Sequence, residues 1–136
     1  MNKPPLYFDS FVLPFPPSAN TYYRSIRMGN ACRVLLSKKG REYKTLVQEV
    51  FSNLEEKNRK RFPIQGRISC NIMLPPPTRR KMDIDNRIKP LLDGLQFAGF
   101  YEDDSAIDHL TVKRGEIKKG GEVWVQLIEL PPKEEP

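Results

Sequence analysis

The sequence has little of what several kinds of functional site require. It contains one histidine, His109, and two cysteines, Cys32 and Cys70, which are far apart and form no ligand-like pair. A zinc hydrolase, a histidine–metal nuclease and a disulfide framework are therefore not expected. We interpret His109 as a polar residue on the face of a strand, and both cysteines as reduced thiols.

Membrane-spanning and export segments are also missing. No apolar run approaches the roughly 20 residues that a membrane helix needs. The N-terminus lacks the basic-then-apolar pattern of a signal peptide. We expect a cytoplasmic protein without a membrane partner.

Two further catalytic devices have no counterpart in the sequence. No Ser/His/Asp set can be assembled around a convincing nucleophile, and there is no glycine-rich phosphate loop. Tyr22 and Tyr23 have the chemistry of a transferase nucleophile. Aromatic residues on a strand, however, more often pack against neighbours or stack on DNA bases.

The chain has an excess of positive charge. Its 136 residues include 23 Lys and Arg against 17 Asp and Glu, a net charge of +6. A positive net charge favours a polyanionic partner, and nucleic acid is the first candidate. A surplus of solvated surface lysines would give the same net charge. The length and the 38% hydrophobic content indicate a single domain, residues 1–136, with loose ends at about 1–5 and 131–136.

Alternating and helical apolar patterns predict the order of the elements. Strands are predicted at 6–13, 21–27, 31–37, 66–74, 107–117 and 122–130, and helices at 38–58 and 86–99. The second and third strands form a ribbon joined at 28–30, and the last two form a hairpin joined at 118–121. This order predicts an α+β fold, a mixed β-sheet with two main helices packed on one side of it.

Both helices carry local signals. Ser37 is a suitable N-cap for the first helix, and Gly99 is a suitable residue to end the second. Pro90 loses a hydrogen bond unless it lies in the first turn, and Gly94 costs about 1 kcal/mol relative to alanine. We therefore expect the second helix to start late or to kink.

Two aspartates precede that helix. Asp83 and Asp85 are two residues apart, so in an extended segment both carboxylates lie on the same side and can face one point. Such a pair suits a cation with all-oxygen ligands, Mg²⁺ or Mn²⁺. Two alternatives are that Asp85 caps the helix or that the pair lies in a solvated acidic turn. Asp103 and Asp104, beyond the helix, could likewise belong to a solvated turn.

Basic residues surround this pair. Five cations, Arg79, Arg80, Lys81, Arg87 and Lys89, against two aspartates leave a charge of +3 over residues 79–89. Salt bridging accounts for part of this pattern. A phosphodiester held against a metal ion accounts for all of it, because cations bind the anionic backbone while carboxylates hold the metal.

The position of Asp104 constrains the site. A helix over 86–99 spans about 21 Å at 1.5 Å per residue. Four extended residues after Phe100 return at most about 14 Å. Asp104 therefore reaches the Asp83 end of the helix only with strain, unless the helix is shorter or kinked. Alternatively, a second copy of the chain supplies the third carboxylate, which leads us to hypothesise a homodimer.

Three stretches together resemble the RusA family of Holliday-junction resolvases. They are "DIDNRIKPLLDGLQFAGFYEDD" (83–104), "LPFPPSANTYYR" (13–24) and "KGGEVWVQLIEL" (119–130), and the resemblance covers roughly residues 11–130. It implies a small, often prophage-encoded endonuclease with a RusA-like dimeric α+β fold. It also implies Mg²⁺-dependent nicking of four-way DNA junctions, with paired cuts in opposing strands, in DNA recombination and repair.

The resemblance also implies roles for individual residues. The catalytic aspartates and metal ligands match Asp83, Asp85 and Asp104, and the important lysine matches Lys89. Asp103 and Asn86 take supporting positions. The DNA-binding residues expected from the resemblance and from the basic run are Asn20, Arg24, Arg79, Arg80, Lys81 and Arg87.

In this reading the metal is Mg²⁺, with Mn²⁺ as a possible substitute. Two alternatives stay open, a metal-dependent nuclease for flaps or other branched DNA and a branch-binding protein that no longer cuts.

Overall fold

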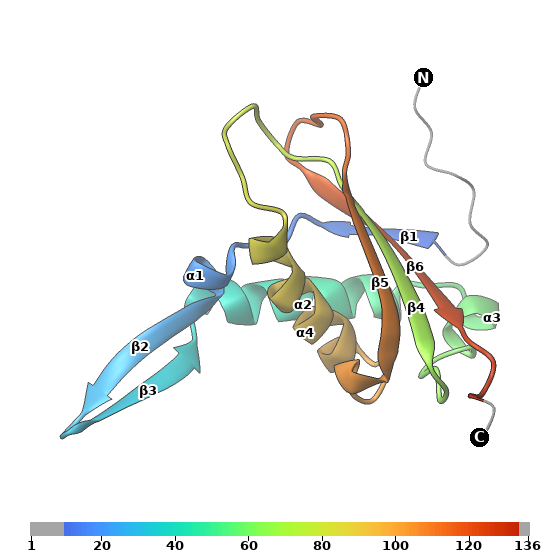
Figure 1. Cartoon of the computed structure of the whole chain (residues 1–136), viewed down its shortest axis with the longest axis horizontal. Helices are drawn as coiled ribbons and strands as arrows, with labels where there is room; N and C mark the ends of the chain where they lie inside the picture. Colours follow the sequence, from blue (N-terminus) through green and yellow to red (C-terminus); the bar gives the residue numbers. More distant parts are fainter. Residues whose placement is uncertain (1–9, 134–136) are drawn as a thin grey trace.

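Four strands form a mixed sheet in the order β1-β6-β4-β5 (Figure 1). They are β1 (Ser10–Pro14), β4 (Ile68–Leu74), β5 (Ile107–Arg114) and β6 (Glu122–Glu129). β6 runs antiparallel to both of its neighbours, whereas β5 runs parallel to β4. The computed structural model describes residues 10–133, so the part of the predicted first strand before Ser10 and most of the predicted loose ends lie outside it.

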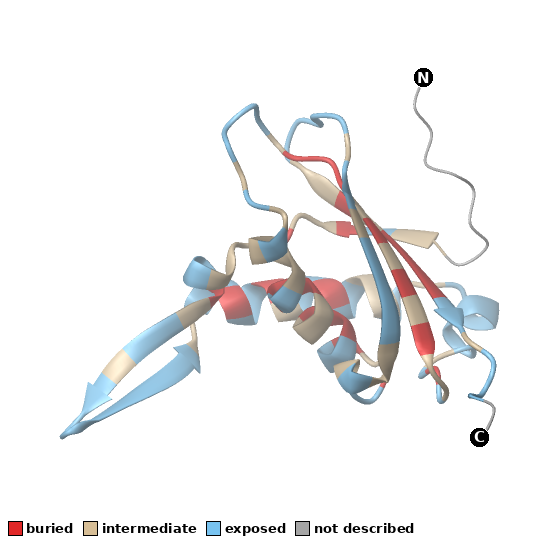
Figure 2. Cartoon of the chain, viewed as in Figure 1, coloured by how far each residue is buried: buried red, intermediate tan, exposed pale blue. Residues whose placement is uncertain are grey.

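The inner face of the sheet makes the hydrophobic core. The predicted alternation in β4 is confirmed, since Ile68, Cys70, Ile72 and Leu74 are all buried. Alternate residues of β6 join them against the helices. Figure 2 shows the buried residues concentrated on β4, β6 and the helices beside them.

Two helices, α2 (Lys38–Ser52) and α4 (Ile88–Ala98), pack against each other and the sheet. The α+β class and the mixed sheet are therefore confirmed. Gly94, which is unfavourable in an isolated helix, allows the close approach of α2 and α4 in this packing. A Cβ atom at Gly94 would lie 3.1 Å from Cγ2 of the fully buried Val47.

The ends of α4 agree with the local signals. A 3₁₀ turn, η1 (Asp85–Arg87), precedes the helix, so Pro90 lies in its first turn where its missing N–H costs little. The predicted late start is confirmed. Gly99 ends the helix with a φ of 107°, in the left-handed region that glycine adopts without strain.

The first helix is shorter than predicted. Ser37 caps it as expected, accepting a hydrogen bond from the Gly40 backbone N–H at 3.0 Å. The helix ends at Ser52, however, and a separate turn, α3 (Glu56–Arg59), follows. Residues 55–61 are exposed and offer no apolar face to bury, so nothing holds them in a continuous helix.

The predicted hairpin between the last two strands is wrong. β4 lies between β5 and β6 and pairs with both. The connection crosses the end of β4, where the Gly115 N–H donates to the Leu74 carbonyl at 2.9 Å and the Lys118 N–H to the Pro76 carbonyl at 2.9 Å. A turn does occur within 118–121, but it belongs to this longer loop.

The predicted ribbon is confirmed as a separate two-stranded hairpin, β2 (Tyr23–Met28) with β3 (Ala31–Leu36). It projects from the body of the molecule beyond the one-turn helix α1 (Ala19–Tyr22) (Figure 1). Met28 and Val34 remain 54% and 64% exposed. Within residues 10–133, no helix has the length and apolar character needed to cross a membrane.

Candidate active site at the start of α4

The predicted metal-binding pair lies where the chain enters α4. Asp83 is the second-last residue of an irregular loop over 75–84, and Asp85 opens η1. Both residues are exposed, and neither carboxylate forms an ion pair with any described residue. The capping alternative for Asp85 is wrong, because no side chain caps η1 or α4. Both carboxylates are therefore available to a cation.

The basic residues around the pair do not neutralise it. Arg79, Arg80 and Lys81 are exposed and form no ion pair with described residues. The Arg87 Nη1 donates instead to the Pro16 carbonyl at 2.9 Å, and its guanidinium lies 5.2 Å from the centre of the Phe15 ring. Partial burial lowers the pKa of Arg87. Arg87 thus anchors the segment that precedes the β2–β3 hairpin.

Lys89 lies in the first turn of α4, and its side chain has two carboxylate partners. Its Nζ is 3.0 Å from Oδ1 of Asp93 and 3.2 Å from Oδ2 of Asp104. The hydrogen bond to Asp93, and then that to Asp104, raises the pKa of Lys89 against the opposing effect of burial. The lysine is therefore a fixed positive charge beside Asp104.

Asp104 returns alongside α4 rather than beyond its end. It opens a second 3₁₀ turn, η2 (Asp104–Ala106), and its backbone N–H donates to Oε1 of Gln96 at 3.1 Å. Asp103 caps this turn by accepting from the Ser105 N–H at 2.9 Å, which lowers the pKa of Asp103. The late start of α4 shortens the distance that this segment has to cover.

The three predicted metal ligands do not form a closed cluster within one chain. Among residues 10–133, no group of three or more His, Cys, Asp and Glu side chains is arranged to hold a metal ion. Asp104 contacts Lys89, and Lys89 follows Asp85 by four residues. The Asp83 and Asp85 carboxylates have no ion-pair partner among the described residues. These oxygen donors fit a hard divalent cation such as Mg²⁺.

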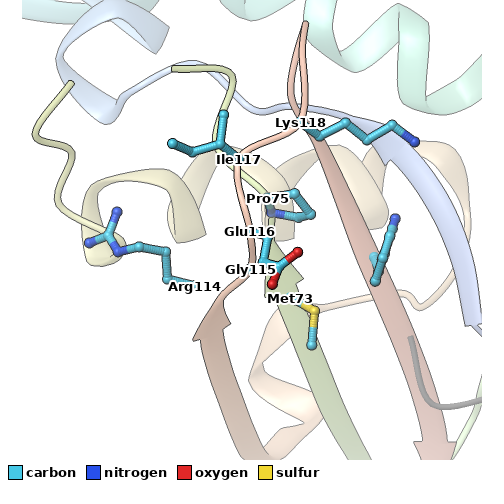
Figure 3. A pocket seen from close by; sticks show the side chains of 8 residues that line it. Met73, Pro75, Arg114, Gly115, Glu116, Ile117 and Lys118 are labelled. Carbon is cyan, nitrogen blue, oxygen red and sulfur yellow. The ribbon is translucent and has the colours of Figure 1, made fainter. Parts of the chain in front are cut away.

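Two adjoining hollows lie at the end of β5, and one of them includes Asp83. One of about 490 Å³ is lined by Met73, Pro75, Arg114, Ile117, Lys118 and Trp124 (Figure 3). The other, of about 600 Å³, includes Arg79, Arg80, Lys81, Asp83 and Arg114. Arg114 is shared by both hollows, and its Nη2 donates to the Met82 carbonyl at 2.7 Å. Three of the predicted DNA-binding cations, Arg79, Arg80 and Lys81, therefore line the same hollow as Asp83.

The remaining predicted residues lie on three other elements. Asn20 is exposed on α1, Arg24 is exposed on β2, and Asn86 is half-buried in η1. No acidic residue occurs between 10 and 41, whereas Arg24, Arg27, Arg33, Lys38, Lys39 and Arg41 are all basic. The hairpin and the start of α2 thus carry a charge of one sign.

Sequence reasoning missed three residues of the site. Asp93 had a detectable signal, because it follows Lys89 by four residues on a predicted helix. Tyr23 was considered only as a nucleophile, a packing residue or a DNA-stacking residue, and no local signal indicated that its hydroxyl donates to Oδ2 of Asp93 at 3.2 Å. Arg114 had none either, since it contacts a backbone carbonyl 32 residues before it in the chain.

The chain is similar to known nucleases over most of its length. The family model for endodeoxyribonuclease RusA matches residues 14–127. A crossover junction endodeoxyribonuclease of Enterobacteria phage HK97 is 38% identical over 120 residues, which covers 88% of this chain and 93% of the relative. Proteins of the same name from Shigella sonnei and Escherichia coli K12 are 33% identical over 121 residues, covering 89% of this chain and 94% of theirs.

Proposed function

Because this chain belongs to the RusA family of endodeoxyribonucleases, we propose that it resolves four-way DNA junctions by paired nicks that depend on Mg²⁺. The observation that carries this proposal is the pair of exposed, unpaired carboxylates at Asp83 and Asp85, close in the chain to Lys89, which pairs with Asp104. The match over residues 14–127 includes all four residues.

Asp83, Asp85 and Asp104 would hold the metal. A bound Mg²⁺ ion supplies a Lewis acid that polarises a phosphoryl oxygen and lowers the pKa of a coordinated water. Mn²⁺ has similar ligand preferences and would substitute for it. The exposed carboxylates of Asp83 and Asp85 support this assignment, since no described cation already occupies them.

Lys89 would stabilise the negative charge that develops on the phosphate during cleavage. Its two carboxylate partners keep the ammonium protonated and limit the positions that its long side chain adopts. Asp103 and Asn86 would support the ligands beside them in the chain. Asp103 does so by shaping the turn that carries Asp104.

The DNA backbone would lie over the basic hollow beside Asp83. Arg79, Arg80 and Lys81 line that hollow, and would grip phosphates without reading base sequence. Asn20 and Arg24 would contact the DNA from the hairpin side. The Arg87 side chain already contacts Pro16 and Phe15, so its contribution to DNA binding would be through its charge and through the segment that it anchors.

We also propose a homodimer in which each metal site is completed by, or depends on, the partner subunit. The support for it is that the described part of one chain assembles no closed three-ligand cluster. Two symmetric sites suit a four-way junction, which itself approximates two-fold symmetry. Light scattering combined with activity tests this point, and a monodisperse monomer with full activity would overturn it.

The decisive experiment uses an end-labelled synthetic four-way junction, a linear duplex of matching sequence and a flap substrate. Symmetric nicks in the junction alone, absent with EDTA and with Asp83→Asn, establish a junction resolvase. Asp108→Asn is the matched control, because it removes an aspartate that pairs with Arg67 outside the site. Efficient cutting of flaps or duplex favours the broader nuclease, and binding without cutting in Mg²⁺ or Mn²⁺ favours a non-cleaving branched-DNA-binding protein.

A further inference from the structure

We propose that Asp93 is a positioning residue of the cleavage site. Its carboxylate holds the Lys89 ammonium beside Asp104 and connects that lysine, through Tyr23, to the base of the β2–β3 hairpin. This inference rests on the proposed function, because the role of Lys89 at the phosphate is part of it.

The two oxygens of Asp93 have different partners. Oδ1 is 3.0 Å from the Lys89 Nζ, and Oδ2 accepts a hydrogen bond from the Tyr23 hydroxyl at 3.2 Å. The Asp93 side chain is 21% exposed, whereas that of Lys89 is 55% exposed. The carboxylate is therefore the inner, fixed partner of the pair, and the lysine extends from it toward solvent.

A lysine and an aspartate four residues apart on a helix often pair simply to stabilise the helix. Two contacts distinguish this pair from that ordinary case. Lys89 has a second partner, Asp104, from outside the helix. Asp93 has a second partner, Tyr23, from the hairpin. The ion pair is thus one link in a chain of contacts that joins β2, α4 and η2.

Lys89 needs such an anchor because its ammonium lies at the end of a flexible four-carbon stem. Once Asp104 is engaged as a metal ligand, Asp93 is the carboxylate that continues to hold the ammonium. Without Asp93, the ammonium would be free to adopt positions away from the phosphate. The loss would appear in the rate of cleavage rather than in the affinity for DNA.

The contact from Tyr23 ties this anchor to the projecting hairpin. Tyr23 is the first residue of β2, and the exposed Arg24 follows it directly. The ring of the buried Tyr22 packs edge-on against the Tyr23 ring, with centroids 4.8 Å apart, and restricts its orientation. A movement of the hairpin on binding DNA would therefore be transmitted through Tyr23 to the carboxylate that positions Lys89.

The first test compares Asp93→Asn with Asp108→Asn under single-turnover conditions on a four-way junction. Asparagine keeps the size of the side chain and removes its charge. We expect the cleavage rate to fall about 10-fold or more in Asp93→Asn, with junction affinity in EDTA unchanged. Asp108→Asn, which breaks an ion pair of similar exposure, should cut at the wild-type rate.

A double-mutant cycle separates positioning from a merely structural role. If Asp93 acts through Lys89, then Asp93→Asn should cause no further loss in a Lys89→Gln background. An equal loss in both backgrounds would overturn the proposal. So would a wild-type cleavage rate in Asp93→Asn while the wild-type protein cuts junctions. Absence of junction cleavage by the wild-type protein would instead refute the proposed function, and this inference with it.

A measurement without metal or DNA checks the contact itself. Brief acetylation followed by peptide mass spectrometry reports the reactivity of each lysine. Lys89 should become severalfold more reactive in Asp93→Asn, and less markedly so in Tyr23→Phe, while the exposed Lys39 stays constant as the internal reference. Unchanged Lys89 reactivity in Asp93→Asn would show that the carboxylate does not hold the ammonium, and would overturn the proposal independently of catalysis.

Discussion

Arg114, the last residue of β5, donates a hydrogen bond from Nη2 to the backbone carbonyl of Met82, the residue before Asp83, at 2.7 Å. The loop over 75–84 has no regular structure of its own. This contact therefore links the rigid sheet to the part of the loop that carries the proposed metal ligand. Figure 3 shows the Arg114 side chain extending from the end of the strand toward that loop.

Replacing Arg114 should loosen the loop around Asp83. We expect Arg114→Gln to raise the Mg²⁺ concentration needed for half-maximal cleavage by about 10-fold, because a ligand that is held less firmly binds the ion more weakly. A Mg²⁺ titration of junction cleavage measures this. The neighbouring Lys113→Gln removes the same charge without this hydrogen bond and should leave the titration unchanged. Equal shifts in both variants would attribute the effect to charge alone.

Neutralising a proposed metal ligand should separate binding from cutting. Asp85→Asn should abolish cleavage in Mg²⁺. In EDTA it should bind the junction at least as tightly as the wild-type protein, because it removes a negative charge beside the phosphate backbone. Fluorescence anisotropy and a cleavage assay on the same substrate measure the two effects. Parallel loss of binding and cleavage would indicate a folding defect or a direct role of Asp85 in DNA contact.

The basic run should bind phosphates in a salt-dependent manner. Arg80→Gln should reduce the slope of log affinity against log salt concentration by about 0.9 if the side chain neutralises one phosphate. The measurement is junction affinity across a salt series in EDTA. Lys60→Gln, on the surface near α3 and paired with Glu56, is the control and should not change the slope. An unchanged slope in Arg80→Gln would remove this residue from the DNA interface.

The start of α2 should tolerate no side chain at Gly40. A Cβ atom there would lie 2.5 Å from the Tyr22 carbonyl oxygen, so the helix or the base of the hairpin would have to move. We expect Gly40→Ala to lower the free energy of unfolding by about 1–3 kcal/mol, despite the better helix propensity of alanine. Urea denaturation measures this, with Lys39→Ala as the matched control on the exposed side. A stable Gly40→Ala protein would contradict this close contact.

The two thiols should differ in reactivity. Cys32 is exposed on β3, whereas Cys70 is buried in β4, and burial raises the pKa of the Cys70 thiol to about 12. Since the thiolate is the reactive form, Cys70 should resist alkylation at pH 8 while Cys32 reacts. Ellman's reagent should titrate one thiol in the native protein and two in denaturant. Rapid reaction of both thiols in the native state would contradict the burial of β4.

Elements with purely local causes could be predicted from the sequence. The alternation in β4, the cap at Ser37 and the late start of α4 all depend on residues close together in the chain. The Asp83 and Asp85 pair was recognisable for the same reason, because a spacing of two and flanking cations are local patterns. In each case the physical cause acts within a few residues.

The pairing of β5 could not be predicted in this way. Residues 118–121 carry a genuine turn signal, which favours a hairpin with β6. β5 instead pairs in parallel with β4 after a crossover through α4, because burying β4 between two strands satisfies its backbone on both sides. The end of α2 at Ser52 has a similar origin, since only packing shows where an apolar face stops finding a partner.

By itself, the sequence determined the α+β class, the positions of most elements and the Asp83 and Asp85 pair of the candidate site, because these follow from periodicity, capping and spacing. Only the tertiary structure decided which strands are neighbours, and which side chains approach Asp83 and Lys89. Arg114 meets Met82, and Tyr23 meets Asp93, across 32 and 70 positions of the chain. Contacts over such separations arise from the packing of the sheet, α4 and the hairpin, and no local pattern encodes them.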